Sequence, residues 1–162
     1  MLGINIENNF SIAQHIQRLV AASAQSVYAM HVLRMRGLDN DALQHIFRAT
    51  VVVRLTYAAS AWCGLTKVPD RKRINSVLAR HNGYYSLDQP TFDELCNAAD
   101  DELFGKAMRL SNHVLHTLIA FRTSASQRYN LRHRSHSLQL PTHTTSLSDS
   151  DFIVRMLYKE IY

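Results

Sequence analysis

The sequence has few of the residues that break or cross-link a chain. Its 162 residues include only five glycines, three prolines and two cysteines. This composition excludes collagen-like, low-complexity and disulfide-stapled classes. No apolar run approaches the roughly 18 residues of a membrane span, and the first residues do not read as a secretory signal. We therefore expect an intracellular protein of one globular domain or slightly more, not attached to a membrane, in which Cys63 and Cys96 are reduced thiols.

Acidic residues are missing from a long part of the chain. The whole sequence carries 18 Lys and Arg against 13 Asp and Glu, a net charge of +5. Six of the acids lie between Asp88 and Glu102, and none lies between Leu103 and Ser148, where basic residues and histidines accumulate. One end of the folded chain should be positive. Such a surface attracts nucleic acid, an anionic membrane or an acidic protein, and charge alone does not separate these partners.

Helical periodicity dominates the first half of the sequence. Apolar residues at intervals of three and four predict one helix over residues 11–36 and a second over residues 39–64. Ser11 with Gln14 has the form of a capping box, and Asp39 is a suitable N-cap for the second helix. Because the two helices are joined by a very short turn, they should form an antiparallel hairpin.

The second half contains shorter helical patterns. A basic helix is expected over residues 70–81, and the pair Thr91 and Glu94 predicts a capping box that opens a short helix. A longer helix should cover residues 100–118, with its acids near the positive end of the helix dipole. A last amphipathic helix is predicted over residues 151–161, which must dock on the body or on a partner because it is short.

These patterns together predict an all-α protein. We expect an antiparallel helical bundle with a short orphan strand at the N-terminus and a basic, largely irregular segment before a C-terminal helix. The predicted divisions are a residual strand at 1–9, a helical domain at 10–83, a second helical region at 84–121, a basic Ser/Thr/His/Arg-rich linker at 122–148 and the C-terminal helix at 149–162.

Catalytic and metal-binding patterns are weak. Asp100 and Asp101 superficially resemble the paired carboxylates that hold two metal ions in polymerases, but they stand at a predicted helix start, where a capping role is the simpler interpretation. His113 and His116 could supply metal ligands together with the two cysteines, yet no Cys-x-x-Cys pair fixes half a site. Nucleophile motifs and glycine-rich phosphate loops are absent from the sequence. The sequence predicts no cofactor.

Two basic clusters are candidates for binding nucleic acid. The first, on the predicted basic helix, could contact duplex phosphates, and the second, around Tyr129 in the predicted linker, suits unpaired RNA because arginine planes and an aromatic ring can stack on bases. Their residues are Arg71, Lys72, Arg73 and Arg80 for the first cluster and Arg128, Arg132 and Arg134 for the second. A solvated basic surface is the competing interpretation of both.

Several local patterns occur in an order typical of one family. They are Leu2-Gly3-Ile4-Asn5-Ile6, Arg54-Leu55-Thr56-Tyr57-Ala58 through Trp62, Arg71-x-Arg73-Ile74, Tyr129-Asn130-Leu131-Arg132-x-Arg134 and Asp151-Phe152-Ile153-x-Arg155-Met156-Leu157-Tyr158. Together they resemble the region downstream of the catalytic palm in reverse transcriptases of non-LTR retrotransposons. The resemblance covers essentially the whole chain.

This resemblance implies that residues 10–83 correspond to the thumb, which in that family packs against the template–primer duplex. The family's catalytic hairpin and palm would lie before Met1, so we expect a non-catalytic fragment of an RNA-directed DNA polymerase. Its partners would be RNA or an RNA·DNA hybrid, and the missing palm domain. Two alternatives stay open: a domesticated helical protein-interaction module whose C-terminal helix docks into a partner, and a small metal-dependent enzyme.

Overall fold

The computed structural model describes residues 3–85, 90–119, 138, 140–141 and 145–159. These residues form helices joined by turns and contain no sheet, which confirms the predicted all-α class. The chain divides into two compact units, Met1–Asn97 (unit 1) and Ala98–Tyr162 (unit 2). Among the described residues no helix is both long and apolar enough to cross a membrane.

Unit 1 begins with an irregular segment followed by the long helix α1, Ala13–Met35. Residues 3–12, the described part of the chain before α1, carry no strand, so the predicted residual strand is not confirmed. The predicted capping box is also wrong: Ile12 is the N-cap, and the Ser11 hydroxyl accepts only from the Ala13 amide at 3.3 Å. Gly37 ends the helix as expected, since its φ of +92° is a left-handed conformation that glycine adopts without strain.

The second predicted helix is broken into several pieces rather than continuous. It consists of α2 (Asn40–Phe47), a π-helical turn η1 (Arg48–Val52), α3 (Val53–Thr56), α4 (Ala59–Trp62) and a 3₁₀ turn η2 (Cys63–Leu65). The Asp39 side chain makes no capping bond. The main break is at Tyr57 and Ala58, where Ala58 has a left-handed φ of 48° and the indole of Trp62 donates to the Tyr57 carbonyl at 3.1 Å. A side-chain bond to the backbone thus replaces helical bonding at this point.

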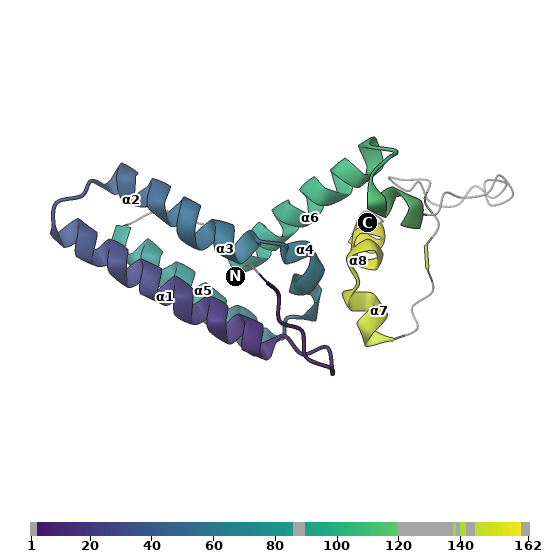
Figure 1. Cartoon of the computed structure of the whole chain (residues 1–162), viewed down its shortest axis with the longest axis horizontal. Helices are drawn as coiled ribbons and strands as arrows, with labels where there is room; N and C mark the ends of the chain where they lie inside the picture. The colour runs from purple at the N-terminus through teal and green to yellow at the C-terminus, as the bar shows by residue number, and fades with distance from the viewer. Residues whose placement is uncertain (1–2, 86–89, 120–137, 139, 142–144, 160–162) are drawn as a thin grey trace, which may run out of the picture. The chain divides into compact units, whose positions relative to one another are not determined.

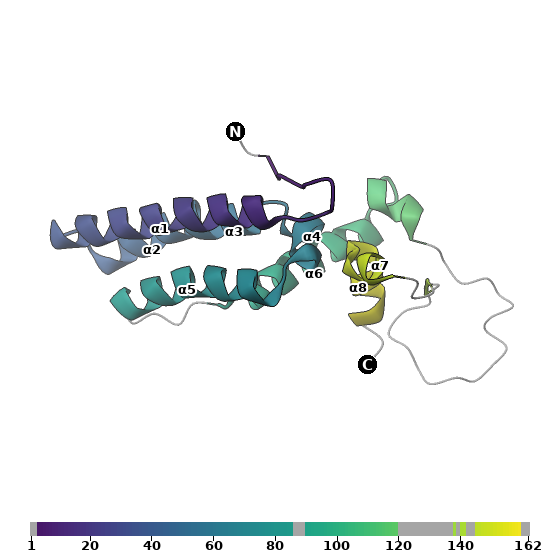
Figure 2. The same cartoon turned by 90° about the horizontal axis from the view of Figure 1, so that it is seen from below.

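The helices of unit 1 lie side by side. The run from α2 to α3 is antiparallel to α1, and α5 (Val68–Tyr85) lies along α1 (Figures 1 and 2). The core between them is made of large apolar side chains that are almost completely buried. They include Ile16, Met30, Leu43, Phe47, Leu55, Trp62 and Ile74. Burying each such side chain contributes about 1.5–3 kcal/mol, which is what fixes α5 in place.

Helix α6 (Phe92–Arg109) is one continuous helix, where the sequence predicted a short helix followed by a longer one. Its capping box is confirmed: the Thr91 amide donates to Glu94 Oε2 at 2.7 Å, and the Glu94 amide donates to Thr91 Oγ1 at 3.3 Å. The helix ends at Arg109 and does not reach residue 118. A turn and the 3₁₀ segment η3 (Val114–Leu118) follow, with the His113 imidazole accepting from the Leu115 amide.

Unit 2 is completed by two short C-terminal helices, α7 (Ser146–Ser150) and α8 (Phe152–Lys159). Met156 and Leu157 of α8 are buried against Phe104, Ala107 and Ile119. An eight-residue helix is marginal alone, so this burial is what stabilises it. The C-terminal helix therefore docks within its own unit, one of the two outcomes that its sequence allowed.

Candidate nucleic-acid interface

One side of α5 is apolar and the other is basic. Ile74, Val77 and Leu78 face the core of unit 1 and are less than 5% exposed. Lys72, Arg73 and Arg80 are exposed. Arg73 and Arg80 are seven residues apart, close to two full turns, so they share one stripe of the helix and Lys72 borders it. We call these three side chains the α5 basic face.

The α5 basic face has no acidic counterpart among the described residues. None of its three side chains forms an ion pair there, although Asp70 lies in the first turn of the same helix. From Lys72 to Arg80 the helix rises about 12 Å at 1.5 Å per residue. A duplex carries one phosphate charge per about 1.7 Å of its axis, so three cations spread over this length can each reach a separate phosphate.

Arg71 belongs to the same predicted cluster but is placed differently. Its guanidinium forms an ion pair with Asp93, donates from Nε to Thr66 Oγ1 at 2.8 Å and contacts the Cys63 carbonyl at 3.4 Å. Asn75 adds a parallel link, because its Oδ1 accepts from the Phe92 amide at 2.9 Å. Arg71 therefore ties η2 and α5 to the first turn of α6, and its predicted contact with phosphate stays a prediction.

A buried histidine follows the last cation of the face. His81 is 0% exposed, stacks on Phe47 with ring centroids 3.5 Å apart and lies 3.3 Å from Gln44 Oε1. Burial lowers the pKa of His81 to about 4. The imidazole is consequently uncharged at neutral pH and adds no positive charge beside Arg80.

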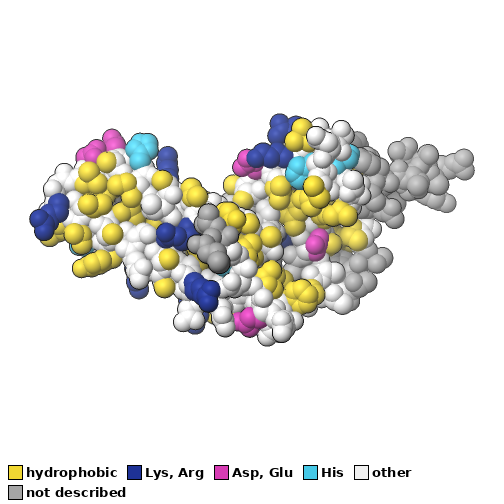
Figure 3. Space-filling model, in the orientation of Figure 1, with side chains coloured by type: hydrophobic (Ala, Val, Ile, Leu, Met, Phe, Trp, Pro, Cys, Tyr) yellow, Lys and Arg dark blue, Asp and Glu magenta, His cyan; other side chains and the backbone are white. Residues whose placement is uncertain are grey.

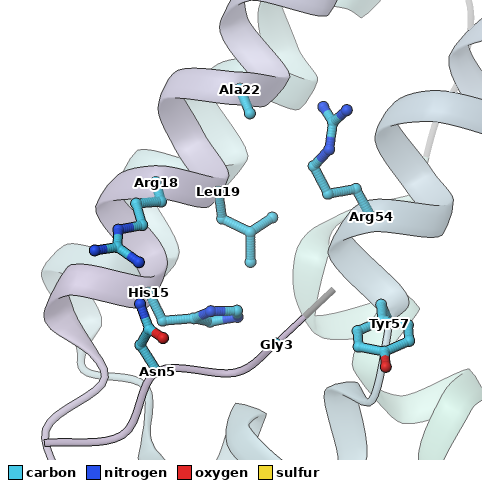
Figure 4. A pocket seen from close by; sticks show the side chains of 8 residues that line it. All are labelled: Gly3, Asn5, His15, Arg18, Leu19, Ala22, Arg54 and Tyr57. Carbon is cyan, nitrogen blue, oxygen red and sulfur yellow. The ribbon is translucent and has the colours of Figure 1, made fainter. Parts of the chain in front are cut away.

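Two further arginines, Arg18 and Arg54, line a cavity of about 240 Å³ (Figure 4). The cavity lies between α1, α3 and the segment that precedes α1. Arg54 donates to Ser26 Oγ at 3.1 Å, and its guanidinium extends away from that of Arg18. His15 also lines the cavity, and its pKa is lowered by burial and by the charge of Arg18. The two guanidinium groups do not converge on one position. Sequence reasoning missed this cavity because its walls come from segments about 40 residues apart.

The other predicted site residues have different outcomes. Arg128, Arg132 and Arg134 lie outside the described residues. Asp100 and Asp101 stand inside α6 and not at a helix start, so the predicted capping role is wrong. They instead pair with cations of α8, Asp100 with Arg155 at 2.7 Å and Asp101 with Lys159 at 2.6 Å.

The candidate metal ligands are used within the fold. His113 caps η3, and His116 Nδ1 lies 2.9 Å from the Ala107 carbonyl. Both cysteines are buried and are not joined in a disulfide. In the part of the chain that the structure describes, no three His, Cys, Asp or Glu side chains are grouped so that they could hold a metal ion.

Comparison with known proteins identifies no relative of this chain. It matches no protein-family model, no curated protein and no solved structure.

Proposed function

We propose that this chain is a non-catalytic, nucleic-acid-binding fragment derived from the reverse transcriptase of a non-LTR retrotransposon. It holds RNA or an RNA·DNA hybrid through the α5 basic face. The observation that supports this proposal most is the arrangement of Lys72, Arg73 and Arg80, which share one exposed side of a helix without an acid paired to them in the described residues. Unpaired surface cations bind phosphates without first breaking an internal ion pair.

Such a face positions a duplex but does not select its sequence. Lys and Arg contacts to phosphate fix the register of the nucleic acid, whereas sequence is distinguished by contacts to base edges. The choice of RNA or an RNA·DNA hybrid rests on the resemblance of residues 10–83 to a polymerase thumb. The palm domain of such an enzyme is the proposed protein partner, and it would supply the chemistry.

The second basic cluster, Arg128, Arg132 and Arg134, is proposed to contact single-stranded RNA beside the duplex. This part of the proposal rests on sequence alone. Arginine planes interleaved with Tyr129 can stack on unpaired bases while they neutralise phosphates.

The direct test replaces the three cations of the α5 basic face with glutamine and measures the affinity for a fluorescent RNA·DNA hybrid. A matched control replaces three exposed arginines on other elements with glutamine, so that the net charge changes equally. These arginines are Arg36, Arg48 and Arg109. We expect the α5 triple variant to lose at least tenfold in affinity at 0.1 M salt. The control should lose much less, because only the field of the whole protein changes.

Equal losses in the two triple variants would contradict the assignment to α5, since a diffuse charge effect would then be sufficient. An unchanged affinity in both would contradict binding through these elements altogether. Replacing Arg128, Arg132 and Arg134 with glutamine tests the second cluster, and it should weaken binding to single-stranded RNA more than binding to a blunt hybrid.

The protein-interaction alternative relied on the C-terminal helix. The apolar side of α8 is covered by unit 2 itself, with Met156 and Leu157 no more than 3% exposed. A partner groove could receive this helix only after it had left its own unit. No observation on α8 favours that alternative.

A further inference from the structure

Helix α1 is apolar on two opposite sides. Its inner side carries the core residues Ile16, Leu19 and Met30, all at most 5% exposed. On the opposite side Tyr28 is 70% exposed, Val32 40% and Met35 76%. Most single exposed apolar residues need no explanation, but three that are consecutive along one helix side form a continuous stripe.

This outer stripe has the spacing of a coiled-coil seam. Tyr28, Val32 and Met35 are separated by four and three residues, which is the alternation of the a and d positions of a heptad. Continued toward the N-terminus, the same alternation passes through Gln25, Ala21, Arg18 and Gln14. The seam, which we call the α1 outer seam, is thus apolar in its C-terminal half, and its N-terminal half is polar except for Ala21.

The N-terminal half of the seam is also hollowed. A shallow surface groove of about 450 Å³ is lined by Gln14, Gln17, Arg18 and Ala21. In the space-filling view, hydrophobic side chains are exposed over the end of unit 1 where α1 meets α2 (Figure 3). The lining of this groove ends at Ala21, seven residues before Tyr28, so the groove and the apolar stripe are two separate parts of the same side of α1.

The charge of α1 decides which helix fits. The helix contains Arg18 and Arg34 and no acid, and the nearest acids in the sequence are Glu7 and Asp39. A second copy paired in parallel would place Arg18 against Arg18 in the seam. A full antiparallel overlap would place the apolar half of one copy on the polar half of the other. Both arrangements are unfavourable: the first brings like charges together, and the second places apolar side chains against polar ones.

We infer that the α1 outer seam docks an acidic amphipathic helix of a partner protein, with apolar side chains against Tyr28, Val32 and Met35 and a carboxylate opposite Arg18. This inference does not depend on nucleic-acid binding by α5. It gives the partner two recognisable features: an apolar strip of about two helical turns and an acid about two to three turns further along the same side.

The test uses synthetic three-heptad peptides as probes for the full chain. One peptide carries leucine at the seam positions that face the apolar half and glutamate at those that face Arg18. Its twin carries lysine in place of glutamate, and each is made in both sequence orders so that either orientation is sampled. We expect the glutamate peptide to bind at least tenfold more tightly than the lysine peptide, and Arg18→Glu to reverse that preference.

Two variants of the apolar half, Tyr28→Asp and Met35→Asp, should each weaken binding of the glutamate peptide at least tenfold. Both positions are more than two-thirds exposed, so the fold should persist, and circular dichroism checks this. The matched control is Val53→Asp on α3, another exposed apolar position at 58%, which should leave binding unchanged.

Three results would overturn the inference. The first is that peptide binding does not depend on the seam, because neither peptide binds or because Val53→Asp weakens binding as much as the seam variants do. The second is a dimer of the wild-type chain in sedimentation that Met35→Asp makes monomeric, which would assign the seam to a second copy. The third is that Met35→Asp abolishes binding of the RNA·DNA hybrid, which would assign it to nucleic acid.

Discussion

The cations of α5 and those of α8 are of the same residue types but have different surroundings. In α8, Arg155 pairs with the buried Asp100 and Lys159 pairs with Asp101. In α5, Lys72, Arg73 and Arg80 face outward without an ion pair in the described residues. Cations that neutralise acids within a unit stabilise that unit, and cations left exposed remain available to an external anion. Net charge alone could not have separated the two roles.

The difference between the cations of α5 and those of α8 is tested most strongly at the buried ion pair of Arg155 and Asp100. Asp100 is 2% exposed, so Arg155→Met leaves a buried carboxylate without its cation. We expect unit 2 to lose about 3–5 kcal/mol of stability. Trp62, the single tryptophan, lies in unit 1, so circular dichroism should report the loss while tryptophan fluorescence changes little. Coincident loss of both signals would contradict a separate role for this pair in unit 2.

The buried histidine of α5 should make the stability of unit 1 depend on pH. The pKa of His81 is about 4 in the folded chain against an ordinary value of 6.5. Its contribution is therefore fully present above pH 6.5 and is lost as the pH falls through 4, by up to about 3 kcal/mol at 1.36 kcal/mol per pKa unit.

The variant His81→Phe keeps an aromatic ring beside Phe47 but cannot take up a proton. We measure the urea midpoint of both proteins by tryptophan fluorescence at pH 7 and at pH 4. The midpoint of the wild type should fall further between these two pH values than the midpoint of the variant. Parallel pH profiles would show that His81 is not kept neutral by burial.

Arg71 allows a structural cation to be compared with the proposed binding cations within α5 itself. Arg71→Gln should lower the stability of unit 1 by about 0.5–1.5 kcal/mol, because the guanidinium donates hydrogen bonds to Thr66 and Cys63. Its ion pair with Asp93 adds little, since both side chains are more than a third exposed and solvent screens their attraction. Under conditions where the variant is folded, its affinity for the hybrid should fall less than that of Arg73→Gln. A greater loss of affinity than in Arg73→Gln would restore Arg71 to the phosphate-binding group.

The smallest effect is expected at the exposed pair of α8. Lys159 and Asp101 are both more than a third exposed, so solvent screens their attraction. Lys159→Gln should change the stability of unit 2 by about 0–1 kcal/mol in thermal unfolding. A loss as large as that of Arg155→Met would mean that burial does not distinguish the two pairs.

Local signals in the sequence predicted the helices and several of their ends. The stop at Gly37 and the capping box of Thr91 and Glu94 depend only on neighbouring residues, and both are present in the structure. The break at Tyr57 and Ala58 was not predictable in this way, because the indole of Trp62 must fold back onto the Tyr57 carbonyl.

The candidate site shows the same division between local and distant causes. The exposure of Arg73 and Arg80 follows from the helical period of the apolar residues Ile74, Val77 and Leu78. The placement of Arg71 depends on Asp93, which is 22 residues away and on another helix. Contacts of this range are set by tertiary packing and leave no periodic signal in the sequence.

The salt dependence of hybrid binding tests the central proposal most directly. Each phosphate contact contributes about −0.9 to the slope of log K against log salt concentration, so the three cations of the α5 basic face should account for a slope of about −2.7. We predict that the slope for the wild-type chain is steeper than that for the Lys72, Arg73 and Arg80 triple glutamine variant by about this amount. Equal slopes for the two proteins, or wild-type binding that does not weaken as salt rises, would contradict the account.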